Sequence, residues 1–146
     1  MMQAADDTPD EGPCALRTVL LIDSEVVVRA PLADYLRDCG LMVLEASTTD
    51  EGRTILVEGR ARVDVVLCDA AAVGTAAGFL FSRWMRARYP AVPVLLAGSV
   101  EKAASLAGDI CDEGPSLGKP YDLSVVLDVI RQAYAARPAR MDDEQA

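Results

Sequence analysis

Three short, nearly continuous apolar runs, separated by segments with helical periodicity, most restrict the fold of this chain. The runs span residues 19–22, 65–68 and 92–97, and a fourth at 42–44 precedes a polar stretch that opens a helix. Apolar runs of this length without alternation are typical of parallel strands covered by helices on both faces. A fifth and shorter strand is expected around residues 116–117, just before Lys119.

Helical segments are expected in the intervals between these runs. The first has apolar residues at 28, 32, 36 and 39 and a stop at Gly40. Because proline is tolerated best in a first helical turn, Pro31 predicts that the regular helix starts at about residue 29 or 30. Further helices are expected around 55–56, with an end near Gly59, around 79–85, and from 123 to 134 after an Asp122 N-cap. Alternating strands and helices predict one doubly wound α/β domain.

The charge distribution sets the boundaries of that domain. The chain has 146 residues and a net charge of −9, yet residues 1–16 carry four acids and no base, and residues 138–146 carry three acids and one base. Acidic segments of this kind are usually solvated and disordered. We therefore expect a domain over residues 17–136, with tails at 1–16 and 137–146.

Composition excludes several classes of function. With no histidine, the chain cannot use a serine–histidine or cysteine–histidine nucleophile or act as a phosphohistidine donor. Its four cysteines form no CxxC pair, which argues against a metal–thiolate site. The sequence has no basic stripe, which argues against direct nucleic-acid binding. No apolar run is long enough to span a membrane. The start does not have the pattern of a signal peptide, so a cytoplasmic protein is expected.

Charged residues follow several of the predicted strands at the point where each strand ends. The ends carry Asp23, Ser24 and Glu25 after the first strand, Asp69 after the third, Ala97, Gly98 and Ser99 after the fourth, and Lys119 and Pro120 after the fifth. In open parallel sheets, ligands bind at these carboxyl ends. Two carboxylates repel unless a cation lies between them, and Mg²⁺ prefers oxygen ligands. One acid alone would be read as a turn former, but the combination with a lysine indicates a phosphoryl site with a nucleophilic aspartate.

These residues lie in segments that resemble the receiver domains of bacterial two-component response regulators. The resemblance covers roughly residues 17–135 and depends on an ordered set of stretches: VLLIDSEVVVRAPLADYLRDCGLMVLEAS, VDVVLCD, GFLFSRWMRARYPAVPVLL and LGKPYDLSVVLDVIRQAY. It implies a flavodoxin-like, doubly wound, five-stranded parallel sheet in the order 2-1-3-4-5, with helices on both faces.

The resemblance also implies residue roles. Asp69 would be the phosphoacceptor, and Mg²⁺ would be held by Asp23, Asp69 and the backbone carbonyl of Ala71. Lys119 would pair with the phosphoryl group, and the bond to Pro120 would be cis. The donor would be a histidine kinase or a phosphotransfer protein. Phosphorylation would alter one face of the domain, and this face would bind a downstream protein partner. In the family, the same face often mediates homodimers.

Four departures from the family pattern make this an atypical receiver. Ser24 replaces the usual second acid, which predicts weak Mg²⁺ binding that Glu25 would offset only partly, through water. The hydroxyl position of the fourth strand falls on Ala97 or Gly98, and Ser99 is better explained as a helix cap. Ser116 stands where an aromatic switch residue is usual. The loop AAAVGTAAG at 70–78 lacks the usual Met-Pro and is expected to position the Ala71 carbonyl less firmly.

Three hypotheses follow. The first is a stand-alone receiver that accepts phosphoryl on Asp69. It would not be an enzyme, and at most would catalyse its own phosphorylation and dephosphorylation. The second is a pseudo-receiver that binds proteins constitutively, without phosphorylation. The third is a flavin or nucleotide enzyme or an aspartate-nucleophile phosphatase. It is the weakest of the three, because acids follow the first strand and neither GxGxxG nor GxxxxGK[ST] occurs.

Overall fold

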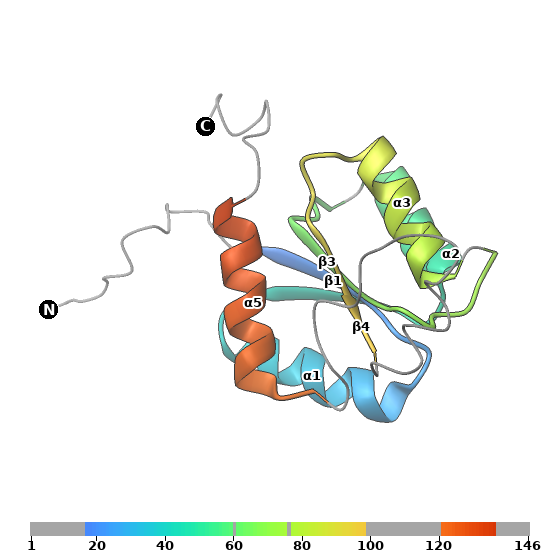
Figure 1. Cartoon of the computed structure of the whole chain (residues 1–146). Helices are drawn as coiled ribbons and strands as arrows, with labels where there is room; N and C mark the ends of the chain where they lie inside the picture. Colours follow the sequence, from blue (N-terminus) through green and yellow to red (C-terminus); the bar gives the residue numbers. More distant parts are fainter. Residues whose placement is uncertain (1–16, 60, 76, 99–120, 137–146) are drawn as a thin grey trace, which may run out of the picture.

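A computed structural model describes residues 17–59, 61–75, 77–98 and 121–136 as a parallel sheet with helices on both faces (Figure 1). In this part of the chain the sheet has four strands in the order β2-β1-β3-β4. They are β1 (Thr18–Ile22), β2 (Met42–Ala46), β3 (Val65–Asp69) and β4 (Val94–Ala97). The doubly wound parallel fold is therefore confirmed. The fifth strand expected at 116–117 and the two tails lie outside the described residues.

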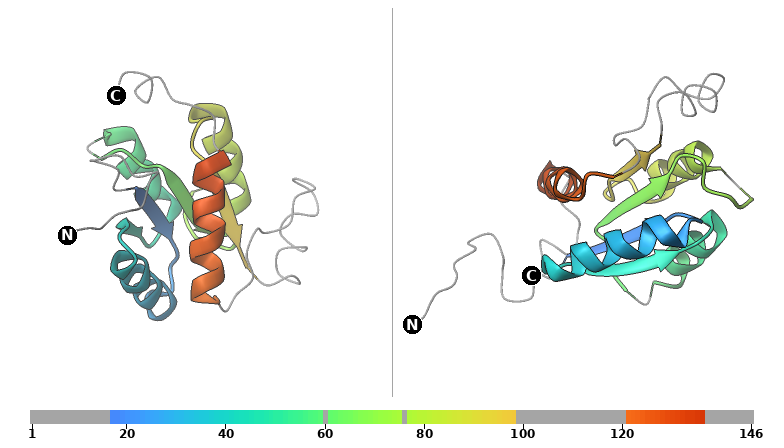
Figure 2. Two further views of the ribbon diagram at one scale, coloured as in Figure 1. Left: turned by 90° about the vertical axis from the view of Figure 1, so that its left-hand side faces the viewer. Right: turned by 90° about the horizontal axis from the view of Figure 1, so that it is seen from below.

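Within the described residues, two helices cover each face of the sheet. They are α1 (Val26–Asp38), α2 (Thr49–Glu58), α3 (Gly78–Arg88) and α5 (Leu123–Ala136). Figure 2 shows α1 and α5 on one side of the strands and α2 and α3 on the other. Each face has its own core, with Leu36 of α1 and Ile130 of α5 in one and Leu56 of α2 and Phe79 of α3 in the other.

The uniformly apolar strands follow from this two-sided burial. Every residue of β1 and β3 is buried, and neighbouring residues point into opposite cores. Leu20 and Ile22 face α2 and α3, whereas Val19 and Leu21 face α1 and α5. An exposed face would have required polar residues at every second position.

The predicted start of the first helix is wrong. Helix α1 begins at Val26, so Pro31 lies inside it and not in its first turn. Proline has no N–H to donate, which leaves the Val27 carbonyl without its helical donor. Val27 is 80% exposed, so water can solvate this carbonyl. The amides of Val28 and Arg29 both donate to the Glu25 carbonyl and close the first turn, at 3.0 and 2.9 Å.

The other elements lie where the sequence predicts them, but β2 ends at Ala46 and not at residue 44, α5 ends at Ala136 and not at residue 134, and β4 starts late. That strand begins at Val94 and not at residue 92, after Pro93, which cannot donate to a neighbouring strand. Helix α2 ends at Gly59, whose φ of 66° is in the left-handed region that glycine tolerates. The Val125 amide donates to Asp122 Oδ1 at 3.4 Å, as expected for an N-cap.

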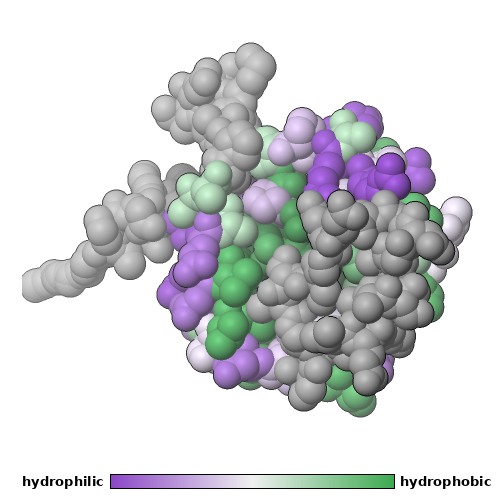
Figure 3. Space-filling model, viewed as in Figure 1, coloured by the Kyte–Doolittle hydropathy of each residue, from purple (hydrophilic) through white to green (hydrophobic). Residues whose placement is uncertain are grey.

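The surface near α5 mixes hydrophobic and hydrophilic side chains (Figure 3). The helix buries Val126, Leu127 and Ile130 and leaves Val125 46% exposed. Among the described residues, no helix has the length and apolar content to cross a membrane.

Candidate functional site

Three carboxylates converge at the carboxyl end of the sheet. Strands β1 and β3 are neighbours, and Ile22 is the register partner of Cys68. Asp23 follows β1 directly and Asp69 ends β3, so the register places these two acids side by side. They are 3% and 7% exposed. One carboxylate oxygen from each of Asp23, Asp69 and the exposed Glu25 lies within 4.8 Å of the others.

Backbone donors orient the two buried acids. Asp23 Oδ1 accepts from the Glu25 amide at 2.9 Å, and the Asp23 amide donates to the Ala46 carbonyl of β2 at 3.0 Å. Asp69 Oδ1 accepts from the Ala71 amide at 3.1 Å. Each aspartate thus bonds the amide two residues ahead, which fixes the carboxylate at the turn that leaves its strand.

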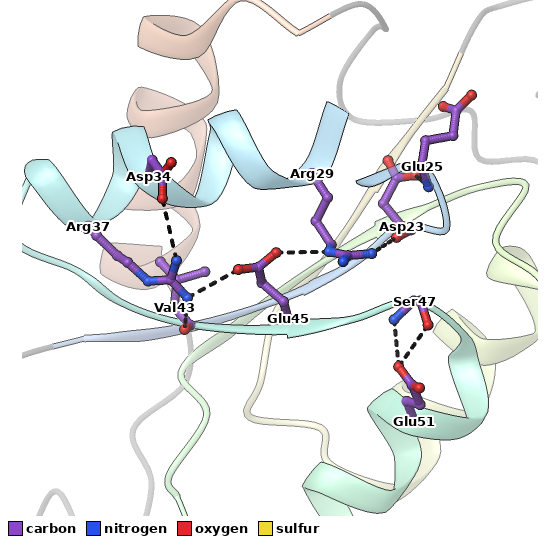
Figure 4. A network of polar contacts seen from close by, with 9 residues as sticks. All are labelled: Asp23, Glu25, Arg29, Asp34, Arg37, Val43, Glu45, Ser47 and Glu51. Atoms are coloured by element: carbon purple, nitrogen blue, oxygen red, sulfur yellow. Dashed lines mark hydrogen bonds and ion pairs between the residues drawn. The ribbon is translucent and has the colours of Figure 1, made fainter. Parts of the chain in front are cut away.

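Arg29 places a largely buried positive charge next to this cluster (Figure 4). Its guanidinium donates to the Asp23 carbonyl at 2.6 Å and to Glu45 Oε1 at 2.9 Å, and its side chain is 14% exposed. The sequence analysis did not select Arg29. A signal existed, because long side chains in a first helical turn lean back toward the helix start and so toward the strand end.

The structure gives Glu25 a more direct place than the sequence analysis did. Glu25 is the N-cap residue of α1 but makes no side-chain capping bond. Its carboxylate instead belongs to the cluster with Asp23 and Asp69. Ser24, which occupies the position of the usual second acid, is exposed. The ends of β1 and β3 and the N-cap position of α1 therefore supply the three acids.

Neither candidate for the fourth-strand hydroxyl can supply one. Ala97 is the register partner of Asp69, is 0% exposed and packs in the core beneath α1 and α5. Gly98 follows it, and a Cβ placed on Gly98 would lie 3.5 Å from the Ala70 Cβ, an ordinary contact. The remaining predicted site residues lie outside the described residues: Ser99, Ser116, Lys119 and Pro120.

Gly78 is required where the loop after β3 enters α3. A Cβ on Gly78 would lie 2.6 Å from the Ala70 carbonyl oxygen and closer still to that of Asp69. Both atoms belong to the backbone and cannot rotate away. Helix α3 can therefore start beneath the acid cluster only with glycine at this position.

Two further titratable groups lie near the acids. Tyr121 is half-buried and packs against the core beneath α1 and α5; burial raises the pKa of its phenol, and the charges of Asp23 and Asp69 add to the effect. Burial is also the main cause that raises the pKa of the Cys68 thiol, with the same carboxylates contributing. Both groups therefore stay neutral at ordinary pH. Cys68 is 0% exposed and packs in the core beneath α2 and α3, and the sequence analysis did not select Tyr121.

The donor set suits a hard divalent cation. Among the described residues the cluster offers oxygen ligands, with two buried carboxylates and one exposed carboxylate whose charges a bound cation would offset. This chemistry fits Mg²⁺, which usually binds through one or two carboxylates together with water and phosphate oxygens.

Comparison with known proteins shows the fold. No protein-family model and no curated relative match the chain. A response regulator receiver protein from Sinorhizobium medicae WSM419 is 24% identical, with a TM-score of 0.71 over 84% of this chain and 98% of that one. The receiver domain of an HD domain-containing protein from Pseudomonas fluorescens Pf-5 is 22% identical, with a TM-score of 0.70 over 82% of this chain and 95% of that one. The beryllofluoride-activated NtrC4 receiver domain dimer is 22% identical, with a TM-score of 0.65 over 81% of this chain and 96% of that one. The chain thus has the fold of a response regulator receiver domain.

Proposed function

We propose that this chain is a response regulator receiver domain that accepts a phosphoryl group on Asp69. The main support is the position of Asp69, which is buried at the end of β3 with the oxygens of Asp23 and Glu25 within 4.8 Å, in a receiver fold. The donor is a histidine kinase or a phosphotransfer protein, and the phosphorylated domain acts through contacts with a downstream protein. The domain spans residues 17–136 and acts in the cytoplasm.

Asp69 is the nucleophile in this proposal. One of its carboxylate oxygens forms a bond to phosphorus while the bond between phosphorus and the donor's leaving group breaks. The Ala71 amide holds Oδ1, so the carboxylate is already oriented before the donor arrives. We assign Lys119 the role of pairing with the transferred group.

We assign the Mg²⁺ site to Asp23, Asp69 and the Ala71 carbonyl, with Glu25 as an additional acid. When bound, the ion offsets the negative charge of the acids and of the phosphoryl oxygens. Ser24 offers only a neutral hydroxyl, so the affinity depends on whether Glu25 supplies the charge missing at position 24. We expect weaker binding than two adjacent buried acids would give.

The alternative is a pseudo-receiver that binds its partner without phosphorylation. The absence of a hydroxyl at both Ala97 and Gly98 favours it, because these positions cannot donate a hydrogen bond to a phosphoryl oxygen. The meeting of two buried acids and one exposed acid at the strand ends favours phosphorylation, because such a cluster suits a bound cation and, with it, a phosphoryl group.

Phosphorylation in vitro distinguishes the two functions. The purified chain would be incubated with Mg²⁺ and acetyl phosphate, or with beryllofluoride, and analysed by intact-mass spectrometry and fluorine NMR. We expect one phosphoryl group on the wild type, none on Asp69→Ala, and normal labelling of Asp34→Ala, which removes an exposed acid of α1. If the wild type stays unmodified at millimolar Mg²⁺, the pseudo-receiver is the correct function.

A further inference from the structure

The loop between β3 and α3 is bonded to the start of α2. The Thr49 amide donates to the Val73 carbonyl at 2.9 Å, and the Thr49 hydroxyl donates to the same oxygen at 3.4 Å. Asp50 Oδ2 accepts from both the amide and the hydroxyl of Thr75, at 3.1 and 3.2 Å. We call these four residues, Thr49, Asp50, Val73 and Thr75, the clasp.

Gly74 allows the two segments to approach this closely. Its φ is 142°, a conformation that side-chain-bearing residues rarely adopt. A Cβ at this position would overlap the Thr49 hydroxyl and would lie 3.1 Å from the Thr49 amide nitrogen. The clasp therefore depends on glycine between its two anchor points on the loop.

The part of the loop nearest the acids is anchored as well. The Ala71 amide donates to Asp69 Oδ1, and the Ala72 amide donates to the Asp69 carbonyl at 2.8 Å. Ala72 is 2% exposed and packs in the core beneath α2 and α3. Ala71 thus lies between Asp69 on one side and the clasp on the other. The sequence led us to expect a loosely held loop, and these bonds provide the restraint that its composition lacks.

We propose that the clasp positions the Ala71 carbonyl for the metal ion, with Asp50 as its principal positioning residue. This inference depends on the proposed function, since it concerns the metal site of the receiver. Asp50 acts through two hydrogen bonds to Thr75 and touches neither the ion nor the phosphoryl group. Restraining the loop in advance reduces the entropy that the chain loses when the ion binds. Helix α2 thereby contributes to the metal site without supplying a ligand.

Trp84 provides a spectroscopic signal for the state of the clasp. A cavity of about 120 Å³ between α2, α3 and the loop is lined by Thr49, Asp50, Arg53, Thr75, Phe81 and Trp84. The Arg53 guanidinium lies 4.7 Å from the centre of the Trp84 ring. Trp84 is the single tryptophan of the chain, so all tryptophan emission comes from one side chain, which borders this cavity.

The test is Mg²⁺ affinity, measured by isothermal titration calorimetry and by Trp84 fluorescence. We expect Asp50→Ala to raise the Kd for Mg²⁺ about tenfold, the lower end of the range for residues behind metal ligands. Asp50→Asn keeps an oxygen acceptor for Thr75 and should recover most of the affinity. Asp34→Ala, which removes the same charge from an exposed site on α1, should bind as the wild type does. A simple loss of negative charge would make Asp34→Ala and Asp50→Asn resemble Asp50→Ala.

The outcomes separate the clasp from the proposed function. If the wild type binds Mg²⁺ and beryllofluoride and Asp50→Ala binds both equally well, the clasp has no role in the metal site and the receiver function stands. If the wild type binds neither, both proposals are wrong. Should Asp50→Ala fail to fold by circular dichroism, Gly74→Ala tests the same point. Gly74→Ala leaves the sequence of α2 unchanged. The added Cβ forces Val73 and Thr75 away from Thr49, so a similar loss of Mg²⁺ affinity is expected.

Discussion

Glu25→Gln should raise the stability of the metal-free domain and reduce the stabilisation that Mg²⁺ adds. In the absence of a cation, the Glu25 carboxylate lies within 4.8 Å of two other carboxylates and repels both. Glutamine keeps the size of the side chain and removes its charge. The metal-free domain should therefore become more stable, whereas the stabilisation that Mg²⁺ provides should decrease.

The size of the effect follows from the distance. Two unit charges 4.8 Å apart interact by about 0.9 kcal/mol at the dielectric constant of water and by about 3.5 kcal/mol at an effective value of about 20. Because Glu25 is exposed, the lower figure applies, and Arg29 offsets part of it. We expect a net gain of about 1 kcal/mol without metal, which corresponds to roughly 4 °C in Tm for a domain of this size.

The assay is thermal unfolding followed by circular dichroism, first in EDTA and then across a Mg²⁺ titration. Asp34→Asn is the control, since it neutralises an exposed acid on the same helix, and neither of its curves should move by more than about 0.5 kcal/mol. If Glu25→Gln leaves both the EDTA curve and the Mg²⁺-dependent shift unchanged, Glu25 does not act on the acid cluster.

Two further predictions test the packing and the electrostatics around the site. Gly78→Ala should destabilise the domain by about 2–3 kcal/mol in chemical unfolding, because its Cβ would meet backbone atoms, whereas Gly98→Ala should stay within about 1 kcal/mol of the wild type. Equal effects at the two glycines would contradict the described backbone. Tyr121 has a raised pKa in the folded state, so its contribution to stability is complete below pH of about 10, the value for an unfolded tyrosine, and is lost as the pH rises above it. Tyr121→Phe should therefore reduce the loss of stability between about pH 10 and pH 11, and an unchanged pH profile would show that the phenol titrates normally.

Much of the fold was predictable from local sequence patterns. Continuous apolar runs indicated strands buried on both faces, and Gly59 and Asp122 marked a helix end and a helix start. The start of α1 was not predicted, because the rule that places proline in a first turn ignores solvent. Val27 is exposed enough for water to replace the hydrogen bond that Pro31 cannot make.

By itself, the sequence determined that Asp23 and Asp69 would meet, because the carboxyl ends of neighbouring parallel strands lie at one edge of a sheet. The tertiary structure decided which other groups join them. Glu25 turns toward the acids, Arg29 bonds the Asp23 carbonyl, and Asp50 bonds Thr75, 25 residues further along the chain. These contacts depend on how helices and loops pack around the strand ends. Apart from Arg29, whose place in a first helical turn was a signal, no periodicity or spacing within a single segment encodes these contacts, so only the folded chain reveals them.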